Sequence, residues 1–267
     1  MWFLLIIPVL AALYVLLTCC RKGHKGLAAL RGWRYAHRGL HSEGVPENSM
    51  AAFRKALDQG YGIELDVHLL RDGSLAVLHD HSLKRTADTD ILIEELDAAD
   101  LQYYHLEGTT QTVPLFCQVL DLVKGRVPLI VELKATTANF AALTQAAVDM
   151  LDGYEGVYCI ESFDPRCIHW LKKHRPELIR GQLAENFFRT GGSMPFILKL
   201  LMSWQLTHFL TLPDFVAFKY RDRKNLGTFL SRKLWGAQGV SWTLRSQEEL
   251  DTAEKEDWIP IFEGFVP

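Results

Sequence analysis

The sequence predicts an α/β fold, a TIM (β/α)8 barrel preceded by an N-terminal transmembrane helix. Three short strand-like runs each lead into or contain polar residues of the types that act in catalysis or bind metal ions. They are 33–36, which leads into His37-Arg38-Gly39, 63–67, which contains Glu64 and Asp66, and 127–131, which leads into Glu132-Leu133-Lys134. Polar residues gathered at the carboxyl ends of strands are typical of parallel α/β enzymes, most often barrels. Alternation of strand-like and helical segments along the rest of the chain favours parallel strand order.

Length and composition indicate one large domain with an accessory segment. The chain has 267 residues, of which 48% are hydrophobic, so it can bury a sizeable core. Its formal net charge of −3 offers no basic bulk of the kind that binds nucleic acid. The five cysteines show no spacing typical of metal sites or disulfide frameworks. Cys159 and Cys167 lie in apolar stretches, which indicates reduced core residues and favours a reducing compartment.

Residues 2–20 form an almost uninterrupted apolar run, close to the roughly 20 residues that a helix needs to span a bilayer. A cleaved signal peptide is the alternative, but no basic region precedes the run and no convincing A-x-A cleavage site follows it. Arg21, Lys22 and Lys25 come directly after the run, and the positive-inside rule places them in the cytoplasm. We therefore expect a transmembrane anchor at 1–21, a basic linker at 22–32 and the barrel at 33–267, in a single-pass protein of the cell membrane whose barrel is cytoplasmic.

The strand at 63–67 is the most informative element because it carries two carboxylates. Period-two alternation places Glu64 and Asp66 on one face and the apolar residues on the other. One interpretation is a half-exposed edge strand with a wet face. The other is a buried parallel strand, in which the two carboxylates would repel each other unless a cation or protons lay between them. The turn at Asp72-Gly73 then folds 75–78 back along this strand and ends in His79-Asp80.

The remaining elements alternate as in a barrel. Asn48 is the expected N-cap of a helix at 49–59, which Gly60 ends. The segment 83–112 is irregular, with a short helix expected around 94–101. Further helices are expected at 115–123, 138–151, 165–174, 226–234 and 247–255, and further strands at 157–160, 179–183, 215–218, 239–242 and 259–262. Eight barrel strands are thus countable, and no helix follows the last of them.

The segment 194–212 is strongly apolar, with Lys199 and His208 as its only charged or titratable residues. One interpretation is a barrel helix that packs on the sheet. The other is an interfacial helix whose Trp204 and phenylalanines dip into the membrane. A chain already held near lipid by residues 2–20 would suit the second interpretation.

The motifs HRG, PEN, E-x-D, DG followed by HD, and ELK occur between His37 and Lys134 in the order found in glycerophosphodiester phosphodiesterases. The chain therefore resembles that family, in a membrane-anchored form. The resemblance implies a TIM-barrel phosphodiesterase with a divalent metal and two histidines. It implies metal-dependent hydrolysis of glycerophosphodiesters to glycerol 3-phosphate and an alcohol, an activity of lipid and glycerol metabolism.

The resemblance assigns Glu64, Asp66 and Glu132 to one divalent ion, and hard oxygen ligands suit Mg²⁺ or Ca²⁺. Such an ion neutralises charge that builds on the phosphate oxygens and orients the nucleophile. The alternative for these residues is a salt-bridged cluster with Arg38 or Lys134.

The resemblance makes His37 and His79 the catalytic acid and base, since imidazole titrates near neutrality. The nucleophile is either water or the adjacent glycerol hydroxyl, and the order of the two histidines stays open. Three residues are expected to contact the substrate. Arg38 would clamp a phosphate oxygen, Lys134 would supply a point charge, and Trp242 would pack on the glycerol or the leaving group. Glu263 stands where the family usually has an aspartate-containing turn, and His68 is a candidate to point inward beside Asp66.

Two further hypotheses predict the same barrel fold with a different function. The first is a lysophospholipase D that acts on membrane lysophospholipids, which the apolar segment 194–212 favours. The second is a catalytically silent, membrane-bound binding barrel. The presence of His37, His79, Glu64, Asp66 and Glu132 together argues against it, because a silent relative need not keep all of them.

Overall fold

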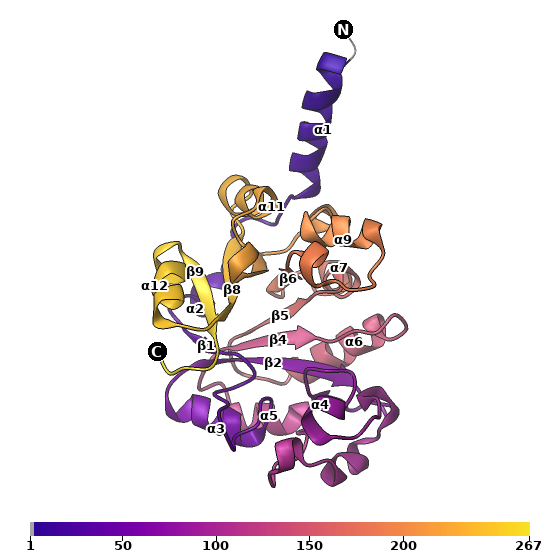
Figure 1. The fold of residues 1–267 in the computed structure, drawn as a ribbon, viewed down its shortest axis with the longest axis vertical. Coiled ribbons are helices and arrows are strands. Elements are labelled where there is room, and N and C mark those ends of the chain that lie inside the picture. The colour runs from indigo at the N-terminus through magenta and orange to yellow at the C-terminus, as the bar shows by residue number, and fades with distance from the viewer. Residues whose placement is uncertain (1–2) are drawn as a thin grey trace.

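The computed structural model describes the backbone of residues 3–267 and the side chains of residues 6–267. Eight parallel strands close into a barrel, because β1 pairs with both β2 and β9 (Figure 1). In barrel order the strands are β1 Tyr35–Ala36, β2 Gly62–Leu69, β4 Leu129–Leu133, β5 Tyr158–Ser162, β6 Arg180–Ala184, β7 Phe215–Lys219, β8 Gln238–Leu244 and β9 Trp258–Phe262. The predicted TIM-like barrel is therefore confirmed. The predicted hairpin is also present, with β3 Leu75–Val77 antiparallel to β2.

Helices in the crossovers cover the outside of the barrel. The longer ones are α3 Met50–Asp58, α5 Phe116–Val123, α6 Phe140–Leu151, α7 Pro165–His174 and α12 Gln247–Lys255. The excursion after β3 contains α4 Lys84–Ala87 and three 3-10 helices, η1 Ile93–Glu95, η2 Ala98–Tyr103 and η3 Leu106–Gly108. The crossover from β6 to β7 contains α8 Phe187–Thr190, α9 Phe196–Ser203 and α10 His208–Thr211. The crossover from β7 to β8 contains η4 Tyr220–Asp222, α11 Leu226–Phe229 and the π-helix η5 Leu230–Leu234.

Strand β2 lies inside the barrel wall, between β1 and β4. Every residue from Gly62 to His68 is buried. The interpretation of this stretch as a half-exposed edge strand is therefore wrong, and its two carboxylates sit on a buried face. A buried pair of this kind needs nearby positive charge.

Residues at the amino ends of the strands fill the barrel interior together with a short helix, α2 Leu27–Leu30. Leu27 and Leu30 are buried against apolar side chains of the strands, among them Ile130 and Phe215. The hydroxyl of Tyr35 donates to the carbonyl oxygen of Leu30 at 3.1 Å, which fixes this helix under the barrel. The amino end of the barrel is thus packed, and the carboxyl end is left for the polar residues.

Several expected boundaries differ from the structure. Ser49, and not Asn48, is the N-cap of α3, since its hydroxyl accepts from the amide of Ala52. The helix expected around 94–101 is replaced by 3-10 turns. The apolar segment 194–212 is broken into α9 and α10, and no helix residue of α9 is fully buried. After β9 the chain stays irregular, and Tyr61 donates to the carbonyl oxygen of Pro267 at 2.7 Å.

The apolar run at the N-terminus forms α1, Phe3–Leu17, which projects away from the barrel in Figure 1. Trp2, the first residue of the expected span, lies outside the described residues. From residue 3 onward, no helix combines the length and the hydropathy needed to cross a bilayer.

Candidate active site

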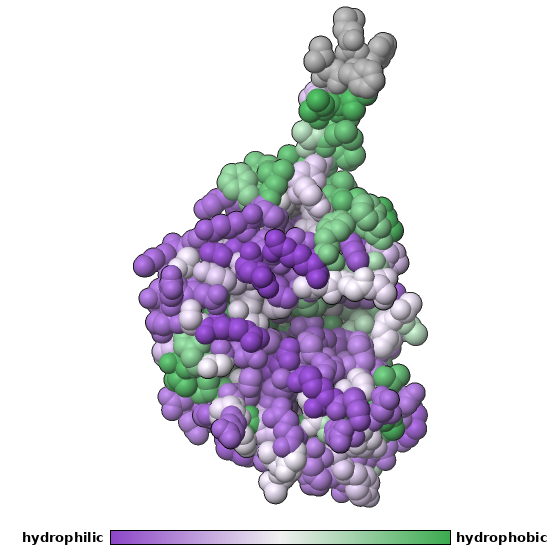
Figure 2. Space-filling model, in the orientation of Figure 1, coloured by the Kyte–Doolittle hydropathy of each residue, from purple (hydrophilic) through white to green (hydrophobic). Residues whose placement is uncertain are grey.

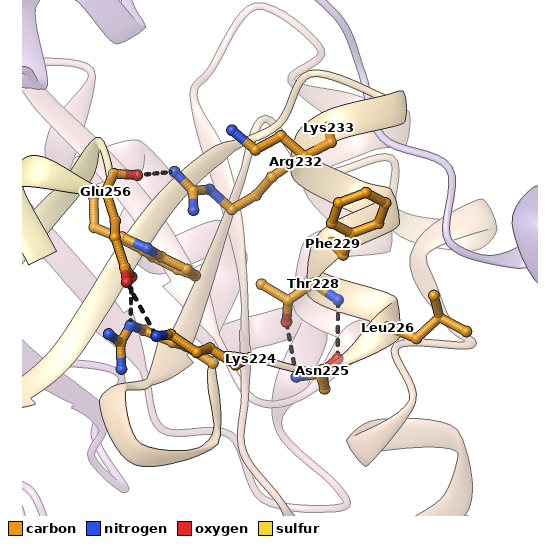
Figure 3. A pocket seen from close by; sticks show the side chains of 10 residues that line it. Lys224, Asn225, Leu226, Thr228, Phe229, Arg232, Lys233 and Glu256 are labelled. Atoms are coloured by element: carbon orange, nitrogen blue, oxygen red, sulfur yellow. Dashed lines mark hydrogen bonds and ion pairs between the residues drawn. The ribbon is translucent and has the colours of Figure 1, made fainter.

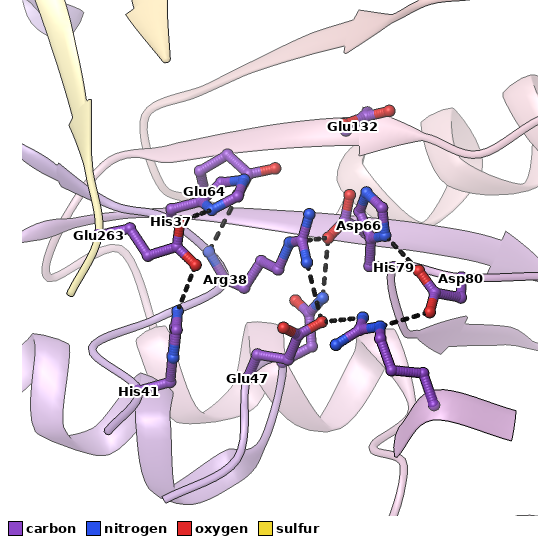
Figure 4. Close-up of polar contacts among 12 residues, drawn as sticks. His37, Arg38, His41, Glu47, Glu64, Asp66, His79, Asp80, Glu132 and Glu263 are labelled. Carbon is purple, nitrogen blue, oxygen red and sulfur yellow. Dashed lines mark hydrogen bonds and ion pairs between the residues drawn. The ribbon is translucent and has the colours of Figure 1, made fainter. Parts of the chain in front are cut away.

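Three carboxylates from two neighbouring strands meet at the mouth of the barrel. Glu64 and Asp66 come from β2, and Glu132 comes from β4 (Figure 4). Asp66 and Glu132 are direct register partners, so the pleat points both side chains to the same side. Each residue offers a carboxylate oxygen, and these oxygens lie within 4.8 Å of one another. All three residues are buried.

The protonation energetics of this cluster fit a site for a cation. Burial, followed by repulsion from Asp66, raises the pKa of Glu64 well above its ordinary value. Burial likewise raises the pKa of Glu132 to about 7. A divalent ion among the oxygens would remove the cost of holding these groups ionised. The donor set is all oxygen, which suits a hard cation.

The alternative interpretation of these carboxylates was a salt-bridged cluster with Arg38 or Lys134, and those ion pairs are also present. The Nζ atom of Lys134 lies 3.1 Å from Asp66 and 2.8 Å from Glu132, and Arg38 Nε lies 3.5 Å from Asp66. These cations, with His79, hold the pKa of Asp66 below its usual range although burial opposes the shift. Among residues 6–267, Glu64 has no lysine or arginine partner as close as these, and burial with the neighbouring carboxylates raises its pKa.

His79 follows β3 and is oriented by its neighbour. Its Nδ1 lies 2.6 Å from the Asp80 carboxylate, so Nδ1 carries the proton and Nε2 is left with its lone pair. Burial lowers the pKa of His79 to about 4, partly opposed by the charge of Asp66. The imidazole is therefore neutral at pH 7 and able to accept a proton.

His37 follows β1 on the other side of the carboxylates. Its Nε2 lies 3.9 Å from Glu64 and its Nδ1 lies 3.5 Å from Glu263, which also contacts His41 at 3.3 Å. Burial lowers the pKa of His37, and the Glu263 carboxylate opposes this shift. Glu263 thus lies beside the Nδ1 atom of His37 without a hydrogen bond to it, whereas Asp80 is hydrogen-bonded to the Nδ1 atom of His79.

The turn after β1 requires glycine. Gly39 has φ +78°, and a Cβ at this position would lie 2.9 Å from the backbone carbon of Ala52. The preceding Arg38 also has positive φ, +55°, which lets its amide donate to Glu64 at 3.0 Å. This turn therefore delivers both His37 and a backbone donor to the site.

Glu47, from the PEN motif, connects the two halves of the site through a chain of ion pairs. It accepts from Arg38 at 2.9 Å and from Arg85 at 2.6 Å (Figure 4). Arg85 also holds Asp80 at 2.6 Å. Asp80, the partner of His79, and Arg38, the cation beside Asp66, are thereby linked through Arg85 and the Glu47 carboxylate.

Two cavities open at the mouth. The first has a volume of about 450 Å³ and is lined by the predicted residues except Asp66: His37, Arg38, Glu64, His79, Glu132, Lys134 and Trp242. The second, of about 890 Å³, shares His79, Glu132 and Lys134 and extends under α9, where its wall is mostly apolar. Phe163 lines both cavities and packs edge to face on Trp242, with 5.7 Å between ring centroids.

The structure adds residues that the sequence interpretation did not select. Glu161 on β5 is the register partner of Glu132, and its buried Oε2 has no hydrogen-bond partner in the described part of the chain. Lys219 ends β7 inside the first cavity and pairs with Glu185 at 2.6 Å. Both are charged residues at strand ends, the same signal that identified Glu132. Asn48, expected as a helix cap, instead donates to Asp66 at 2.8 Å.

His68 is buried on β2 but does not join the three carboxylates. Its Nδ1 lies 2.9 Å from Glu94, and its Nε2 lies 3.3 Å from the carbonyl oxygen of His79. His81 also contacts Glu94, at 2.5 Å. His68 therefore supports the backbone of His79 from behind.

The sequence and the fold are similar to those of known proteins. Residues 37–194 match the model of the "Glycerophosphoryl diester phosphodiesterase family". The chain is 30% identical over 229 residues to a glycerophosphodiester phosphodiesterase of Caldanaerobacter subterraneus, covering 81% of this chain and 87% of that protein. It is 37% identical over 130 residues to a glycerophosphodiester phosphodiesterase of Bacillus altitudinis, covering 45% of this chain and 53% of that protein.

Among solved structures, a phosphodiesterase of Oleispira antarctica in complex with the product sn-glycerol-3-phosphate superposes with a TM-score of 0.73. Its sequence identity is 22%, and the match covers 86% of this chain and 92% of that one. At this identity the likeness supports the fold alone. The matches extend along the barrel, whereas the match to the Bacillus altitudinis protein spans about half of that protein's length.

Proposed function

We propose that this chain, which belongs to the glycerophosphoryl diester phosphodiesterase family, uses one divalent metal ion to hydrolyse glycerophosphodiesters to glycerol 3-phosphate and an alcohol. The observation that carries the proposal is the meeting of Glu64, Asp66 and Glu132, with carboxylate oxygens within 4.8 Å of one another. His37 and His79 line the same cavity, so an imidazole would stand on either side of a phosphate group bound there.

Glu64, Asp66 and Glu132 would hold the ion, and Mg²⁺ or Ca²⁺ suits their oxygen atoms. When bound, such an ion neutralises charge that builds on the phosphate oxygens and orients the attacking oxygen. Arg38 and Lys134 line the cavity and add positive charge for the anionic substrate. Both are already paired with carboxylates, Arg38 with Glu47 and Lys134 with Asp66 and Glu132, so both stay candidates for a phosphate contact.

The two histidines divide the proton transfers. A neutral imidazole accepts the proton of the attacking hydroxyl as its oxygen bonds to phosphorus. The other imidazole, protonated, gives its proton to the alcohol oxygen as the second phosphorus–oxygen bond breaks. Asp80 and Glu263 would stabilise the protonated form of His79 and His37 respectively. The attacking hydroxyl belongs either to water or to the glycerol of the substrate.

Trp242 would form the wall against which the glycerol or the leaving group packs. Its ring lies in the first cavity beside Phe163, and Lys219 Nζ lies 5.4 Å from its centroid. An aromatic face with a nearby ammonium group suits a small polar substrate that carries one negative charge.

The activity is tested by release of choline and glycerol 3-phosphate from glycerophosphocholine, with and without EDTA. We expect turnover that EDTA abolishes and that added Mg²⁺ or Ca²⁺ restores. His79→Ala should lose activity, and His105→Ala, which replaces an exposed histidine away from the mouth, should keep it. No turnover of glycerophosphocholine or of lysophosphatidylcholine with metal restored would contradict the proposal and favour a silent binding barrel.

A lysophospholipase D activity is the second candidate, and one observation favours it. The cavity of about 890 Å³ begins at His79, Glu132 and Lys134 and continues along apolar side chains of the α9 region: Met194, Leu198, Leu201 and Met202. A phosphodiester at the carboxylates could extend one apolar chain into this space. Turnover of lysophosphatidylcholine without turnover of glycerophosphocholine would make this the principal activity.

We also propose that residues 2–20 hold the protein at the cell membrane with the barrel on the cytoplasmic side. Support comes from the apolar side chains that α1 leaves exposed: Ile6, Ile7, Val9, Leu10, Leu13 and Leu16. Arg21, Lys22 and Lys25, which follow α1, supply the charge asymmetry that favours this orientation.

The exposed Cys117, on the barrel, allows a direct test of this orientation. In intact cells a membrane-impermeant maleimide should label Cys117 only after permeabilisation. A Cys117→Ser variant identifies the signal. Labelling of Cys117 in intact cells would contradict the cytoplasmic location, and loss of the protein from the membrane fraction in carbonate would contradict the anchor.

A further inference from the structure

The segment α11–η5 is fixed directly against α1. The indole N–H of Trp235 donates to the carbonyl oxygen of Val15 at 3.1 Å. The hydroxyl of Ser231 donates to the carbonyl oxygen of Thr18 at 3.4 Å. At Gly227 a Cβ would lie 3.0 Å from the hydroxyl of Tyr14, so this turn of α11 touches α1 without space for a side chain. The crossover between β7 and β8 and the N-terminal helix therefore present one continuous surface.

Apolar side chains are exposed on this surface. Leu226, Phe229 and Leu234 are exposed to 54%, 59% and 48% of their full areas, which is unusual for three such residues within nine positions. Figure 2 shows the green surface of α11 beside the base of α1, with a second green area over α9. In α9, Phe196 and Ile197 are exposed to 70% and 57%. Three elements thus share one apolar end of the molecule.

A cationic pocket of about 490 Å³ lies beside Leu226 and Phe229 (Figure 3). Its charged lining consists of Arg223, Lys224, Arg232 and Lys233 with a single carboxylate, Glu256. Arg223 and Lys224 already pair with Glu256, at 2.9 and 3.3 Å. The positive charge of this pocket is therefore in excess.

Arg232 is the most informative cation of the pocket. Its Nη2 donates to the carbonyl oxygens of Glu256 and Asp257, both at 2.8 Å, and its guanidinium lies 4.0 Å from the Trp258 ring centroid. It makes no ion pair with any residue from position 6 onward. The buried indole N–H of Trp258, in the same wall, also has no acceptor among the described residues. A cation that is fixed in place without a carboxylate partner, in a pocket with excess positive charge, points to an anionic ligand.

We propose that this pocket binds the phosphate group of an anionic phospholipid of the bilayer. Arg232 and Lys233 would face the phosphate, while Leu226 and Phe229 enter the acyl region beside α1. A free phosphate ion would make no favourable contact with the apolar rim formed by Leu226 and Phe229. This rim is continuous with the exposed apolar side chains of α1 and α9. The site is separate from the catalytic cavities and goes beyond the proposed hydrolysis, since it recognises the membrane and not the substrate.

The test compares binding of the full chain to vesicles of phosphatidylcholine alone and of phosphatidylcholine with phosphatidylglycerol, at low and high salt. We expect tighter binding to the anionic vesicles at low salt. The double variant Lys224→Ala/Lys233→Ala should lose much of this preference, because each basic residue near an anionic surface contributes about fivefold. Binding to pure phosphatidylcholine, which reports on α1, should not change.

The control is Lys55→Ala/Lys84→Ala, which removes the half-buried Lys55 of α3 and the exposed Lys84 of α4, far from α1 in Figure 1. Equal loss in both double variants, or no loss in the first, would overturn the proposal. Phe229→Ser separates a lipid from a free anion. It should weaken binding to anionic vesicles, and unchanged vesicle binding together with phosphate binding that depends on Lys233 would also overturn it. Turnover of glycerophosphocholine in solution should be unchanged in all of these variants, so its loss would report on the catalytic proposal instead.

Discussion

At the scale of single residues, the site is a balance between buried like charges and the groups that offset them. Glu64 and Glu132 have raised pKa values, whereas the charges of Lys134 and Arg38 help to hold the pKa of Asp66 below its usual range. Such a cluster is costly to bury without a cation. Its position at the mouth of the barrel therefore favours a functional role over a stabilising one.

The histidine–carboxylate pairs make a prediction at this scale. His79→Ala should lower kcat for glycerophosphocholine by roughly 10²- to 10⁴-fold, because a proton transfer loses its carrier. Asp80→Asn should lower kcat by a smaller factor and leave KM nearly unchanged, since Asp80 positions His79 at 2.6 Å and lines only the second cavity. Steady-state kinetics of both variants measure this. Equal kcat in wild type and His79→Ala would contradict the assignment.

At the scale of elements, α9 decides between the two candidate substrates. Leu201 faces the cavity of about 890 Å³, whereas Leu200, one position earlier, lines a different cavity. For a lysophospholipid, Leu201→Gln should raise KM by about tenfold through loss of apolar contact. Leu200→Gln is the matched control and should change KM little. Neither variant should affect turnover of glycerophosphocholine, and an equal effect of both on the lysophospholipid would argue against an acyl site under α9.

The junction between α10 and the N-terminal segment predicts a pH dependence of stability. His208 is fully buried, with Nδ1 3.6 Å from Cys20 Sγ and 3.3 Å from Ser231 Oγ, and burial lowers its pKa to about 3. Below an ordinary pKa of about 6.5 the unfolded chain binds a proton that the folded chain does not. The free energy of unfolding should therefore fall as pH drops from 6.5 toward 3, by up to about 1.4 kcal/mol per pH unit from this group.

His208→Gln removes this contribution. Thermal unfolding between pH 4 and 7 should show a weaker pH dependence for His208→Gln than for the wild type. His105→Gln, which replaces an exposed histidine, should keep the wild-type slope. Parallel curves for wild type and His208→Gln would contradict the account of this junction.

Much of the barrel was predictable because its signals are local. A strand that carries Glu64 and Asp66 on one face, and a tight turn at Asp72-Gly73, are defined by neighbours in the sequence. Burial of β2 on both sides was not predictable from its own residues, since it depends on closure by β1, a strand of only two residues. The break of segment 194–212 into α9 and α10 likewise depends on the surface that it covers.

That the candidate site residues lie together was predictable for the same reason, and their ion-pair partners were not. The family motifs contain His37, His79 and the three carboxylates. The chain of ion pairs through Glu47 and Arg85 joins residues 38 positions apart and has no local signature. Glu161 was missed although it follows the same strand-end rule as Glu132, because β5 lacks a family motif around it.

At the scale of the whole molecule, the amino end of the barrel is packed with apolar side chains and the carboxyl end holds the candidate active site. A third surface, outside the barrel, is apolar. Helix α2 fills the amino end, and the carboxylates and histidines occupy the carboxyl end. The exposed apolar residues of α1, α9 and α11 gather at one pole (Figure 2). The membrane contact proposed above would use this pole, which includes α9 at the edge of the second cavity.

The central claim is that Glu64, Asp66 and Glu132 hold one divalent ion on which hydrolysis depends. The most direct test is titration of metal-free protein with Mn²⁺, followed by electron paramagnetic resonance, alongside restoration of glycerophosphocholine turnover. We expect one ion per chain, activity that rises with its binding, and binding at least about tenfold weaker in Asp66→Asn. Full activity in metal-free protein, or equal Mn²⁺ affinity in wild type and Asp66→Asn, would contradict the claim.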